Sequence, residues 1–496
     1  MSRVRKVVIV GGGTAGWMAA AGLAKSLGRT IEITLVESDA IGTVGVGEAV
    51  IPLIKSFHAL LDLEEDRFLR AVNGTFKLGI EFENWGQLGE SYFHPFGPTG
   101  VEAWAAQFHH YWLKARRQGE SDALRRFSLE ASMAKEGKFT LESNPQPQYA
   151  YHFDASLYAK LLRQIAEDHG VRRVEGKVVE VDVHGETGFI EAVLLESGER
   201  LEGDLFIDCS GFRGLLIQQA LDTPWEDWSH WLRNDRAVAV QTESVGAPAP
   251  YTRSTARPFG WQWKIPLQNR VGNGLVYCSE HLDDEDARNR LLGNVEGKTL
   301  TDPRTIRFRT GRRSRQWARN CVAVGLSSGF LEPLESTSIH LIQNSILRLV
   351  RMFPVDGIDS AEVRQFNDET TTEIEQIRDF IILHYKVTRR ADSEYWNACR
   401  EMDVPEHLAH KIALFESNAR AVRDNNEMFR ERSWAAVMLG QGIVPRGYHP
   451  FVDNLNDEQL RGLMNEVKSN VARIVAASPS HSDFLQAYCP IGTQRN

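Results

Sequence analysis

The stretch VVIVGGGTAGWMAAAGLAKSLGRTIEITLVES, residues 7–38, decides the fold. Val7 to Val10 is a short apolar strand, and Thr14 to Lys25 carries alanine and leucine at helical spacing. Ile31 to Val36 is a second apolar strand. A strand, a glycine turn, a helix and a strand in this order predict a βαβ unit, and therefore an α/β protein.

The glycines of this stretch predict a dinucleotide site. Gly11, Gly13 and Gly16 form a GxGxxG pattern between the first strand and the helix. A turn without side chains lets a pyrophosphate approach the free N–H groups at the helix N-terminus. Glu37 ends the second strand, where a carboxylate can accept hydrogen bonds from ribose hydroxyls. A bare GxGxxG pattern also occurs in structural turns, but the strand, the helix and the terminal acid together favour dinucleotide binding.

Two later segments favour FAD over NAD. GDLFIDCSGFRG (203–214) and CVAVGLSSGF (321–330) each place an apolar strand before a glycine turn. Such late returns to the nucleotide domain suit a flavin, whose ribityl chain and ring extend past the first βαβ unit. The sequence has no second GxGxxG pattern for a nicotinamide cofactor. We therefore expect the flavin to arrive already reduced.

Composition excludes several classes of partner. The 496 residues are 42% hydrophobic with a formal net charge of -9, and no long Lys/Arg run is present. This balance provides no electrostatic basis for binding nucleic acid or an anionic membrane surface. Neither a signal peptide nor an apolar run long enough to span a bilayer is recognisable. We expect small molecules or proteins as partners, and a cytoplasmic location.

No metal site is expected from the cysteines and histidines. Five cysteines lie far apart, make an odd count and form no CxxC pair, so neither a disulfide framework nor a zinc site is indicated. The adjacent His109 and His110 would point to different faces of a helix, and no acidic residue stands at ligand spacing from them.

The segment GWQWKIP, residues 260–266, predicts an aromatic wall. Alternation places Trp261 and Trp263 on the same face of an extended strand. Pro266 ends the capacity of that strand to donate hydrogen bonds. Taken alone, the two tryptophans are most simply core aromatics.

Six segments carry a resemblance to a known family, over nearly the whole length. They are GGGTAGWMAA (11–20), GVGEAVIP (45–52), FKLGIEFENW (76–85), YFHPFG (92–97), GWQWKIP (260–266) and GFLEPLESTS (329–338). The sequence resembles the FAD-dependent tryptophan halogenases, and the WxWxIP pattern with the separate lysine is the most specific part of the match.

The resemblance implies a fold and a division of the chain. The expected fold is an FAD-binding Rossmann-like domain of the flavin monooxygenase type with an added, mainly helical substrate module. The FAD-binding domain would be discontinuous, formed by 1–90, 150–225 and 305–350. Residues 91–149 and 226–304 would form a substrate-facing layer, and 351–496 the helical module.

The resemblance also implies roles for individual residues. Lys77 would carry the halogenating species, as a haloamine or as a donor to hypohalous acid, and Glu335 would steady the cationic arene intermediate or accept its proton. Trp261 and Trp263 would separate the flavin from the substrate. FAD would contact Gly11, Gly13, Thr14, Ala15, Gly16, Glu37, Glu48, Ala49, Val178, Gly325, Leu326 and Ile339; the halide would contact Thr337 and Ser338; and the aromatic substrate would contact Ile80, His94 and Phe96.

Several of these residues also have ordinary structural interpretations. An isolated lysine such as Lys77 is usually a solvated surface residue, although its apolar neighbours would lower its pKa if the side chain pointed inward. Glu335 could simply place negative charge near a helix N-terminus, with Ser336 or Thr337 as an ordinary N-cap.

Two departures from the family pattern bear on specificity. Many members have glycine where this chain has Ser338, so chloride and bromide both stay open. Members specific for free tryptophan hold its amino-acid part with a tyrosine pair, an acid and an aromatic pair, whereas this chain reads MLGQGIVPRGYHPFVD (438–453). We therefore expect an indole-like or other electron-rich arene, free or carried on a protein.

The predicted function is a two-component, FAD-dependent aromatic halogenase. It would use reduced FAD from a separate NAD(P)H-dependent flavin reductase, O2 and halide to form hypohalous acid. A flavin monooxygenase that hydroxylates an aromatic substrate and a non-catalytic FAD-binding redox module are the alternatives. Retention of Lys77 and Glu335 argues against the module, because neither residue is needed to hold FAD. A homodimer is one option for the assembly.

Overall fold

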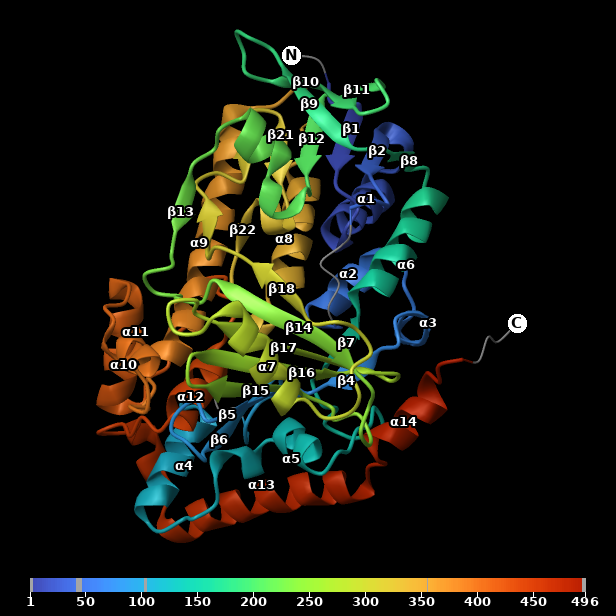
Figure 1. The fold of residues 1–496 in the computed structure, drawn as a ribbon. Helices are drawn as coiled ribbons and strands as arrows, with labels where there is room; N and C mark the ends of the chain where they lie inside the picture. The colour runs from blue at the N-terminus through green and yellow to red at the C-terminus, as the bar shows by residue number, and fades with distance from the viewer. Residues whose placement is uncertain (1–2, 42–46, 102–104, 355, 493–496) are drawn as a thin grey trace. The chain divides into compact units, whose positions relative to one another are not determined.

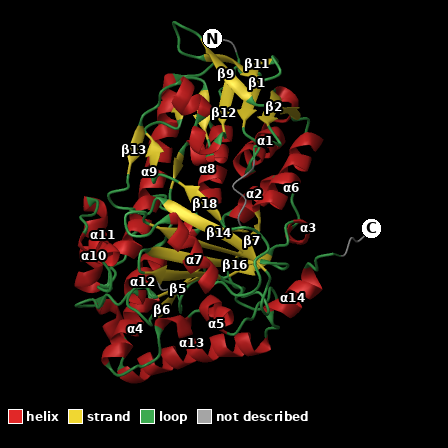
Figure 2. Ribbon diagram, viewed as in Figure 1, coloured by secondary structure: helices red, strands yellow, loops and turns green. Residues whose placement is uncertain are grey.

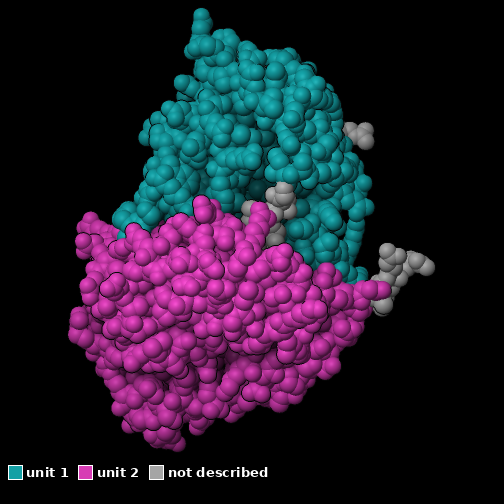
Figure 3. All heavy atoms as spheres, in the orientation of Figure 1, with its two compact units in different colours: residues 1–72, 153–230, 308–375 teal, residues 73–152, 231–307, 376–496 magenta. Residues whose placement is uncertain are grey.

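The chain forms two compact units, each built from three stretches of sequence. The computed structural model describes residues 3–41, 47–101, 105–354 and 356–492, so positions 45 and 46 of the GVGEAVIP motif lie outside the described residues. Unit 1 comprises residues 1–72, 153–230 and 308–375, and unit 2 comprises residues 73–152, 231–307 and 376–496 (Figure 3). The functional division expected above, with its three parts, is a different assignment and stays a prediction.

A six-stranded sheet lies at the centre of unit 1 (Figure 1). Its strands, in spatial order, are β20 (Trp317–Ala318), β21 (Cys321–Ala323), β12 (Leu205–Asp208), β1 (Lys6–Val10), β2 (Glu32–Glu37) and β8 (Arg172–Glu175). Neighbouring strands are parallel except for the pair β20–β21. The βαβ unit and the strand at Leu205–Asp208 are confirmed, because β1, α1 (Thr14–Leu27) and β2 follow one another as expected.

Helices pack closely around this sheet. The first helix, α1, contacts α6 (Ala155–Asp168) and α8 (Ser338–Arg351). Gly22 makes the close approach of α8 possible, because a Cβ atom there would lie 2.9 Å from Ile346. Two shorter helices, α2 (Ile54–Leu60) and α3 (Glu65–Ala71), follow before residue 72.

Smaller sheets and a π-helix complete unit 1. The antiparallel strands β9 (Val178–Val183), β10 (Ile190–Leu195) and β11 (Arg200–Glu202) share one apolar core with β1, β12 and the π-helix Leu215–Ala220. The other short strands are β3 (Gly47–Ala49), β13 (Trp225–Asp227), β19 (Gly311–Arg313) and β22 (Gly329–Phe330). Both carboxylate oxygens of Asp208 accept backbone hydrogen bonds, and Oδ2 accepts those of Leu216 and Ile217 at 2.8 and 2.9 Å. The acid that ends β12 thus anchors the start of the π-helix.

Unit 2 contains a seven-stranded sheet. Its strands, in spatial order, are β18 (Arg304–Arg307), β14 (Arg236–Thr242), β17 (Val271–Tyr277), β16 (Gly260–Pro266), β15 (Thr252–Arg257), β5 (Gly79–Glu83) and β6 (Ser91–Pro95). Only β15 and β5 run parallel; the other pairs are antiparallel. A separate strand, β4 (Thr75–Lys77), pairs antiparallel with β7 (Ala150–Asp154). The GWQWKIP segment is therefore a strand, as expected.

The last part of the chain is almost entirely helix and loop (Figure 2). It contains α9 (Ser360–Lys386), α10 (Glu394–Glu401), α11 (Glu406–Asn418), α12 (Glu431–Gly440), α13 (Asp457–Ala477) and α14 (His481–Tyr488). Earlier helices of the same unit are α4 (Phe108–Arg117), α5 (Leu129–Lys135) and α7 (Asp284–Asn294). No helix within the described residues is both long enough and apolar enough to cross a membrane.

Candidate functional site

Each glycine of the first turn occupies its position for a different geometric reason. Gly11 has a φ of +111°, and a Cβ atom there would lie 2.2 Å from the carbonyl oxygen of Cys209 at the end of β12. A Cβ at Gly16 would lie 1.8 Å from the carbonyl oxygen of Gly11, so α1 packs directly onto the turn. A Cβ at Gly13 would meet nothing within 4 Å, so this position is open. The turn therefore combines tight packing with one open position, as the GxGxxG pattern requires.

The start of α1 is suited to an anion. Gly13 is its N-cap residue and provides no side-chain hydrogen bond to the helix. The first N–H groups of a helix have no intrahelical partner, and the helix dipole favours negative charge there. The residues present thus fit the pyrophosphate of a dinucleotide such as FAD.

Glu37 lies beside this turn at the end of β2. A Cβ at Gly12 would lie 1.6 Å from its Oε2 atom, so the glycine in this second position makes room for the carboxylate. Arg173 donates to Oε1 at 2.6 Å, and the indole of Trp17 donates to Oε2 at 3.4 Å. A carboxylate offers about four lone-pair sites. Glu37 therefore keeps acceptor capacity for ribose hydroxyls, although no local sequence pattern indicates Arg173 as its partner.

Two further stretches predicted to contact FAD come close to these residues within unit 1. Gly325 has a φ of +75°, and a Cβ there would lie 2.9 Å from Ala15 of α1. Leu326 follows it in the short 3-10 helix Gly325–Ser327. Val178 begins β9, two residues after Gly176, whose N–H donates to the carbonyl of Glu37 at 2.8 Å. The turn, the end of β2 and the Gly325 segment thus gather around one end of the sheet.

Glu48 stands out among the candidate flavin residues by its electrostatics. It lies in β3 between Gly47 and Ala49, which are both buried. Burial raises the pKa of the Glu48 carboxyl to about 7. Perturbed carboxyl groups of this kind are common at functional sites, where the environment favours one protonation state.

The start of α8 carries the residues predicted to bind halide. Thr337 is the N-cap residue and Ser338 the first residue of the helix. The expectation that Ser336 or Thr337 is an ordinary N-cap is wrong for the side chains, because α8 has no side-chain cap hydrogen bond. Within the described part of the chain, the buried hydroxyl oxygen of Thr337 has no hydrogen-bond partner. A buried, unused donor beside free helix N–H groups suits an anion.

The residues just before α8 are buried and turn sharply. Glu335, 1% exposed, ends the 3-10 helix Pro333–Glu335. Ser336 has a φ of +61°, in the left-handed region that residues other than glycine seldom adopt. Such a conformation persists only where the surrounding structure enforces it, and it is frequent at functional sites. Ile339, the next predicted flavin contact, is 4% exposed in the first turn of α8.

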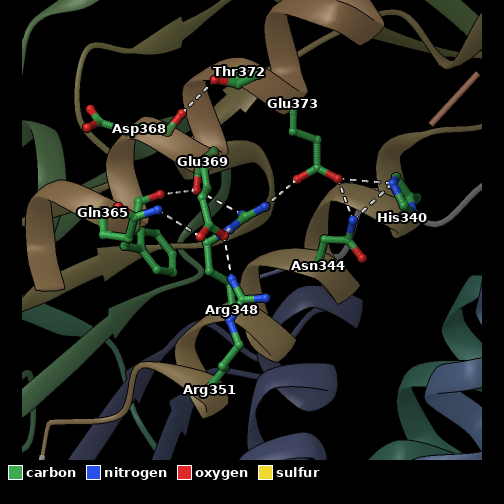
Figure 4. A network of polar contacts seen from close by, with 11 residues as sticks. His340, Asn344, Arg348, Arg351, Gln365, Asp368, Glu369, Thr372 and Glu373 are labelled. Atoms are coloured by element: carbon green, nitrogen blue, oxygen red, sulfur yellow. Dashed lines mark hydrogen bonds and ion pairs between the residues drawn. The ribbon is translucent and has the colours of Figure 1, made fainter. Parts of the chain in front are cut away.

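A buried ionic network fixes the first turns of α8 against α9 (Figure 4). His340 Nε2 lies 3.1 Å from both Glu373 Oε1 and Asn344 Nδ2. Arg348 donates to Glu373 at 2.9 Å and to Glu369 at 3.1 Å. Burial alone would raise the pKa of Glu373, but the hydrogen bond with His340 and the charges of His340 and Arg348 outweigh it and lower the pKa to about 2. Glu373 is thus a stable anion that holds the first turns of α8 against α9.

In unit 2, Lys77 is a fully buried lysine. It ends β4 opposite Ala150 of β7, and its exposure is 0%. Its Nζ atom lies 5.1 Å from the centre of the Phe96 ring, within range of a cation–π interaction. Burial, and then the charges of Lys77 and His481, lower the pKa of the neighbouring His152 well below its usual value. The interpretation of Lys77 as a solvated surface residue is therefore wrong.

The three predicted substrate residues come from one region of unit 2. Ile80 in β5 and His94 in β6 are directly opposed cross-strand partners. The N–H of Phe96 donates to the carbonyl of Leu78 at 3.1 Å. The His94 ring lies 5.7 Å from the ring of Phe380, measured between centroids.

Sequence reasoning missed further neighbours of these residues. Phe380 stacks on Phe429 with a centroid distance of 3.7 Å, and His94 lies 6.3 Å from Phe429. Arg432 of α12 donates to the carbonyl oxygen of Phe96 at 3.1 Å. Phe380 lies in an apolar helical stretch and Phe429 just before α12, so neither local pattern distinguishes them from core residues.

Trp261 and Trp263 lie near the middle of the seven-stranded sheet. Their ring centroids are 6.0 Å apart and the planes are tilted by 56°, in agreement with the predicted shared face. The Trp263 indole covers the backbone of Gly274 in β17, because a Cβ there would lie 2.0 Å from the ring. Both tryptophans are buried, with exposures of 1% and 7%.

The adjacent histidines lie close together but have different hydrogen-bond partners. Their rings are 4.2 Å apart. Both belong to the first turn of α4. The His109 Nε2 atom lies 2.8 Å from the carbonyl oxygen of Ala419, and His110 Nδ1 accepts the N–H of His449 at 3.1 Å. Burial lowers the pKa of His109 to about 4, so it is neutral at pH 7.

These features define a class of protein. Unit 1 has the parallel sheet, the open glycine turn and the uncapped helix start of a dinucleotide-binding flavoprotein. Unit 2 holds a buried lysine among aromatic side chains. The chain belongs to the tryptophan halogenase family, whose pattern it matches over residues 6–457. It is a flavin-dependent halogenase.

Relatives and solved structures agree with this assignment. The chain is 35% identical to the tryptophan 6-halogenase SttH of Streptomyces toxytricini, over 97% of this chain and 98% of the relative. It is similar to the structure of Xcc4156, a flavin-dependent halogenase from Xanthomonas campestris, with a TM-score of 0.97 and 50% identity over 99% and 100% of the two chains. BrvH, a flavin-dependent halogenase from Brevundimonas sp. BAL3, matches with a TM-score of 0.94 and 48% identity, over 98% of this chain and 100% of that chain.

Proposed function

We propose that this halogenase acts on an indole-like or other electron-rich aromatic substrate, with Lys77 as the residue that delivers the halogen. The observation that carries the proposal is the complete burial of Lys77 with its ammonium 5.1 Å from the Phe96 ring. Burying a charged ammonium group costs free energy unless the group interacts with a partner. At this position the ammonium group would donate to hypohalous acid, or the amine would form a haloamine.

The overall reaction balances in two steps. When bound, reduced FAD supplies two electrons, so that reduced FAD, O2, halide and one proton yield FAD, hypohalous acid and water. Hypohalous acid then transfers its halogen to an arene carbon. That carbon loses its proton, which combines with the remaining hydroxide to form water. The electrophile is the halogen atom, and the arene ring is the electron donor. Electron-rich rings are therefore favoured substrates.

Each candidate residue has a role in this scheme. Gly11, Gly13, Thr14, Ala15 and Gly16 would hold the pyrophosphate, with Glu37 on a ribose. The other flavin contacts we propose are Glu48, Ala49, Val178, Gly325, Leu326 and Ile339. Thr337 and Ser338 would bind chloride or bromide at the start of α8. Glu335 would steady the positively charged ring or accept the proton that the halogen replaces.

Unit 2 residues would position the arene and keep the oxidant selective. Ile80, His94 and Phe96 would contact the flat faces and edges of the ring. Trp261 and Trp263 would prevent contact between the arene and the flavin. Hypohalous acid would then have to diffuse from the flavin to the arene. This separation favours halogenation over direct hydroxylation, which is the alternative activity.

The native substrate is expected to differ from free tryptophan. The segment 438–453 does not provide the tyrosine pair, acid and aromatic pair that would hold an amino-acid group. The test is a comparison of kcat/KM for indole and for tryptophan, with bromide and then chloride, and with products identified by their halogen isotope pattern. Preference for the unclamped arene is expected. A strong preference for tryptophan would contradict the substrate proposal, and oxygenated products alone would favour the monooxygenase alternative.

We further propose that reduced FAD comes from a separate NAD(P)H-dependent reductase. The motivation is the single GxGxxG pattern of the sequence. Purified protein with FAD and NADH should oxidise NADH only at the background rate until a flavin reductase is added. Fast oxidation of NADH by the purified protein alone would contradict this proposal.

A further inference from the structure

A cluster of possible metal ligands lies in unit 2, in a part of the sequence that the halogenation chemistry does not use. Cys278, Glu280 and His281 each offer one ligand atom, and these three atoms lie within 4.8 Å of one another. The segment connects β17 to α7. Cys278 is buried, His281 is partly buried and Glu280 is exposed, so the cluster has a route to solvent.

The backbone of this segment is already folded around the thiol. The carbonyl of Cys278 accepts the N–H groups of His281 and Leu282 at 3.1 and 3.2 Å, and its own N–H donates to Phe259 at 3.1 Å. The N–H of Glu280 hydrogen-bonds the sulfur of Cys278. A tight turn with an N–H directed at the sulfur stabilises a thiolate, as it does beneath bound metals.

A second carboxylate, on the residue just before β14, fixes the turn. Asp235 accepts the N–H of Ser279 at 2.8 Å and its hydroxyl at 2.7 Å. Ser279 stands between Cys278 and Glu280 in the chain, so this pair of hydrogen bonds holds the backbone between two of the ligands. Outer hydrogen bonds of this kind orient metal ligands and raise affinity.

The local charges favour a cation. The charges of Glu280 and Asp235 act on Cys278, while the charge of Arg233 opposes them. A divalent cation at this cluster would be attracted by the two carboxylates. The metal must displace the thiol proton, and one proton is then released for each metal bound.

We propose that Cys278, Glu280 and His281 bind a divalent metal ion of the zinc class, with water as the fourth ligand. Thiolate, imidazole and carboxylate are the three ligand types that Zn²⁺ accepts in tetrahedral sites. Bonds of 2.0–2.3 Å place tetrahedral ligands about 3.3–3.8 Å apart. The three ligand atoms lie within 4.8 Å of one another, so small side-chain adjustments would be needed to close the cluster around an ion. The CxEH order lacks the paired cysteines of common zinc motifs, which is why cysteine spacing did not predict it.

The test uses the full-length protein without an affinity tag, after removal of metals with a chelator. Titration with Co²⁺ should produce a thiolate-to-cobalt charge-transfer band and the visible bands of tetrahedral cobalt, at one equivalent. Zn²⁺ should abolish these bands and release about one proton per metal. Zn²⁺ should also raise the melting temperature, because it binds only the folded turn.

Variants distinguish metal binding at this site from nonspecific metal binding elsewhere on the protein. Cys278→Ser and His281→Asn should weaken Co²⁺ binding more than about tenfold, and Cys278→Ser should remove the charge-transfer band. His410→Asn, which changes an exposed histidine of the same unit, and Cys399→Ser should bind as the wild type does. The proposal is overturned by the absence of a charge-transfer band in excess Co²⁺, or by unchanged binding in both Cys278→Ser and His281→Asn. Because His281 is only partly buried, its variant tests the proposal even if Cys278→Ser folds poorly.

Discussion

The ammonium group of Lys77 lies 5.1 Å from the centre of the Phe96 ring, although the two residues come from different strands and loops of unit 2. The β4–β7 pairing holds the Lys77 backbone, while Arg432 of α12 holds the carbonyl of Phe96 at 3.1 Å. The cation and the ring are thus fixed by separate elements. A side chain positioned in this way can act on a ring-shaped substrate without a large rearrangement.

Lys77→Met should abolish most of the halogenation and leave flavin binding intact. Methionine keeps much of the volume of a buried side chain but removes the ammonium group. Loss of one positioned donor typically lowers the rate about a hundredfold or more. Product formation and FAD affinity are measured on the same preparation. Lys298→Met, at an exposed position of unit 2, is the control and should keep full activity. Near-normal halogenation in Lys77→Met would mean that the buried lysine is structural.

Thr337→Val tests the proposed halide site at the start of α8. Valine removes only the hydroxyl, and within the described residues this hydroxyl has no protein partner to lose. The melting temperature should therefore change little, while the KM for halide should rise about tenfold, as expected for a lost hydrogen bond to an ion. Thr372→Val, which removes an exposed hydroxyl bonded to Asp368, is the control. An unchanged halide KM would rule out Thr337 as a halide ligand.

Gly274→Ala should displace the Trp263 indole. The added Cβ atom would lie 2.0 Å from the ring, so the side chain has to move. If the tryptophans separate the arene from the flavin, the variant should form more oxygenated product and less halogenated product per reduced flavin. Gly293→Ala, in α7 with nothing within 4 Å, is the matched control. An unchanged product ratio with a shifted indole would argue against the barrier role.

Glu373→Gln should reveal a pH-dependent contribution to stability. The pKa of Glu373 is lowered to about 2 from 4.5. Its stabilisation is therefore complete above pH 4.5 and is lost as the pH falls from 4.5 towards 2. The variant should lose up to about 3 kcal/mol of unfolding free energy at pH 7, and this difference should shrink below pH 4.5. Urea unfolding at pH 7 and at a pH below 4.5 measures this difference in free energy. Glu466→Gln, at an exposed position, is the control. A difference that does not depend on pH would contradict the assignment.

Glu48→Gln should show the opposite sign. Burial raises the pKa of Glu48 to about 7, so the folded, flavin-free protein holds a proton that the unfolded chain releases near 4.5. The stability of the wild type should fall as the pH rises from 4.5 to 7, because the folded state binds more protons in that interval. Glutamine cannot ionise, so the variant should be the more stable protein at pH 8 and equal to it below pH 4.5. Equal stability at pH 8 would show that Glu48 is not held in its protonated form.

The local elements of unit 1 could be predicted because their signals are local. Helix α1 and strands β1 and β2 follow from apolar spacing and glycine punctuation within residues 7–38. The same holds for β16, where alternation and a terminal proline specify a strand.

The partners of the candidate residues could not be predicted, because they come from distant segments. Arg173 reaches Glu37 across the β2–β8 pairing, and no local pattern announces it. The burial of Lys77 depends on strands that join it from residue 150 onward. The missing side-chain cap at Thr337 also escaped prediction, because a threonine before an apolar helix normally caps it.

The order of strands in the unit 1 sheet has a consequence for biosynthesis. Val7 of β1 pairs with Leu205 of β12, and Phe206 of β12 pairs with Cys321 of β21. While the chain emerges from the ribosome, the apolar strand VVIV keeps one bare edge until residues 205–208 have appeared. A bare, uncharged strand edge is a template for wrong pairing between nascent chains. We therefore expect fragments that stop before residue 205 to aggregate more readily than the full chain.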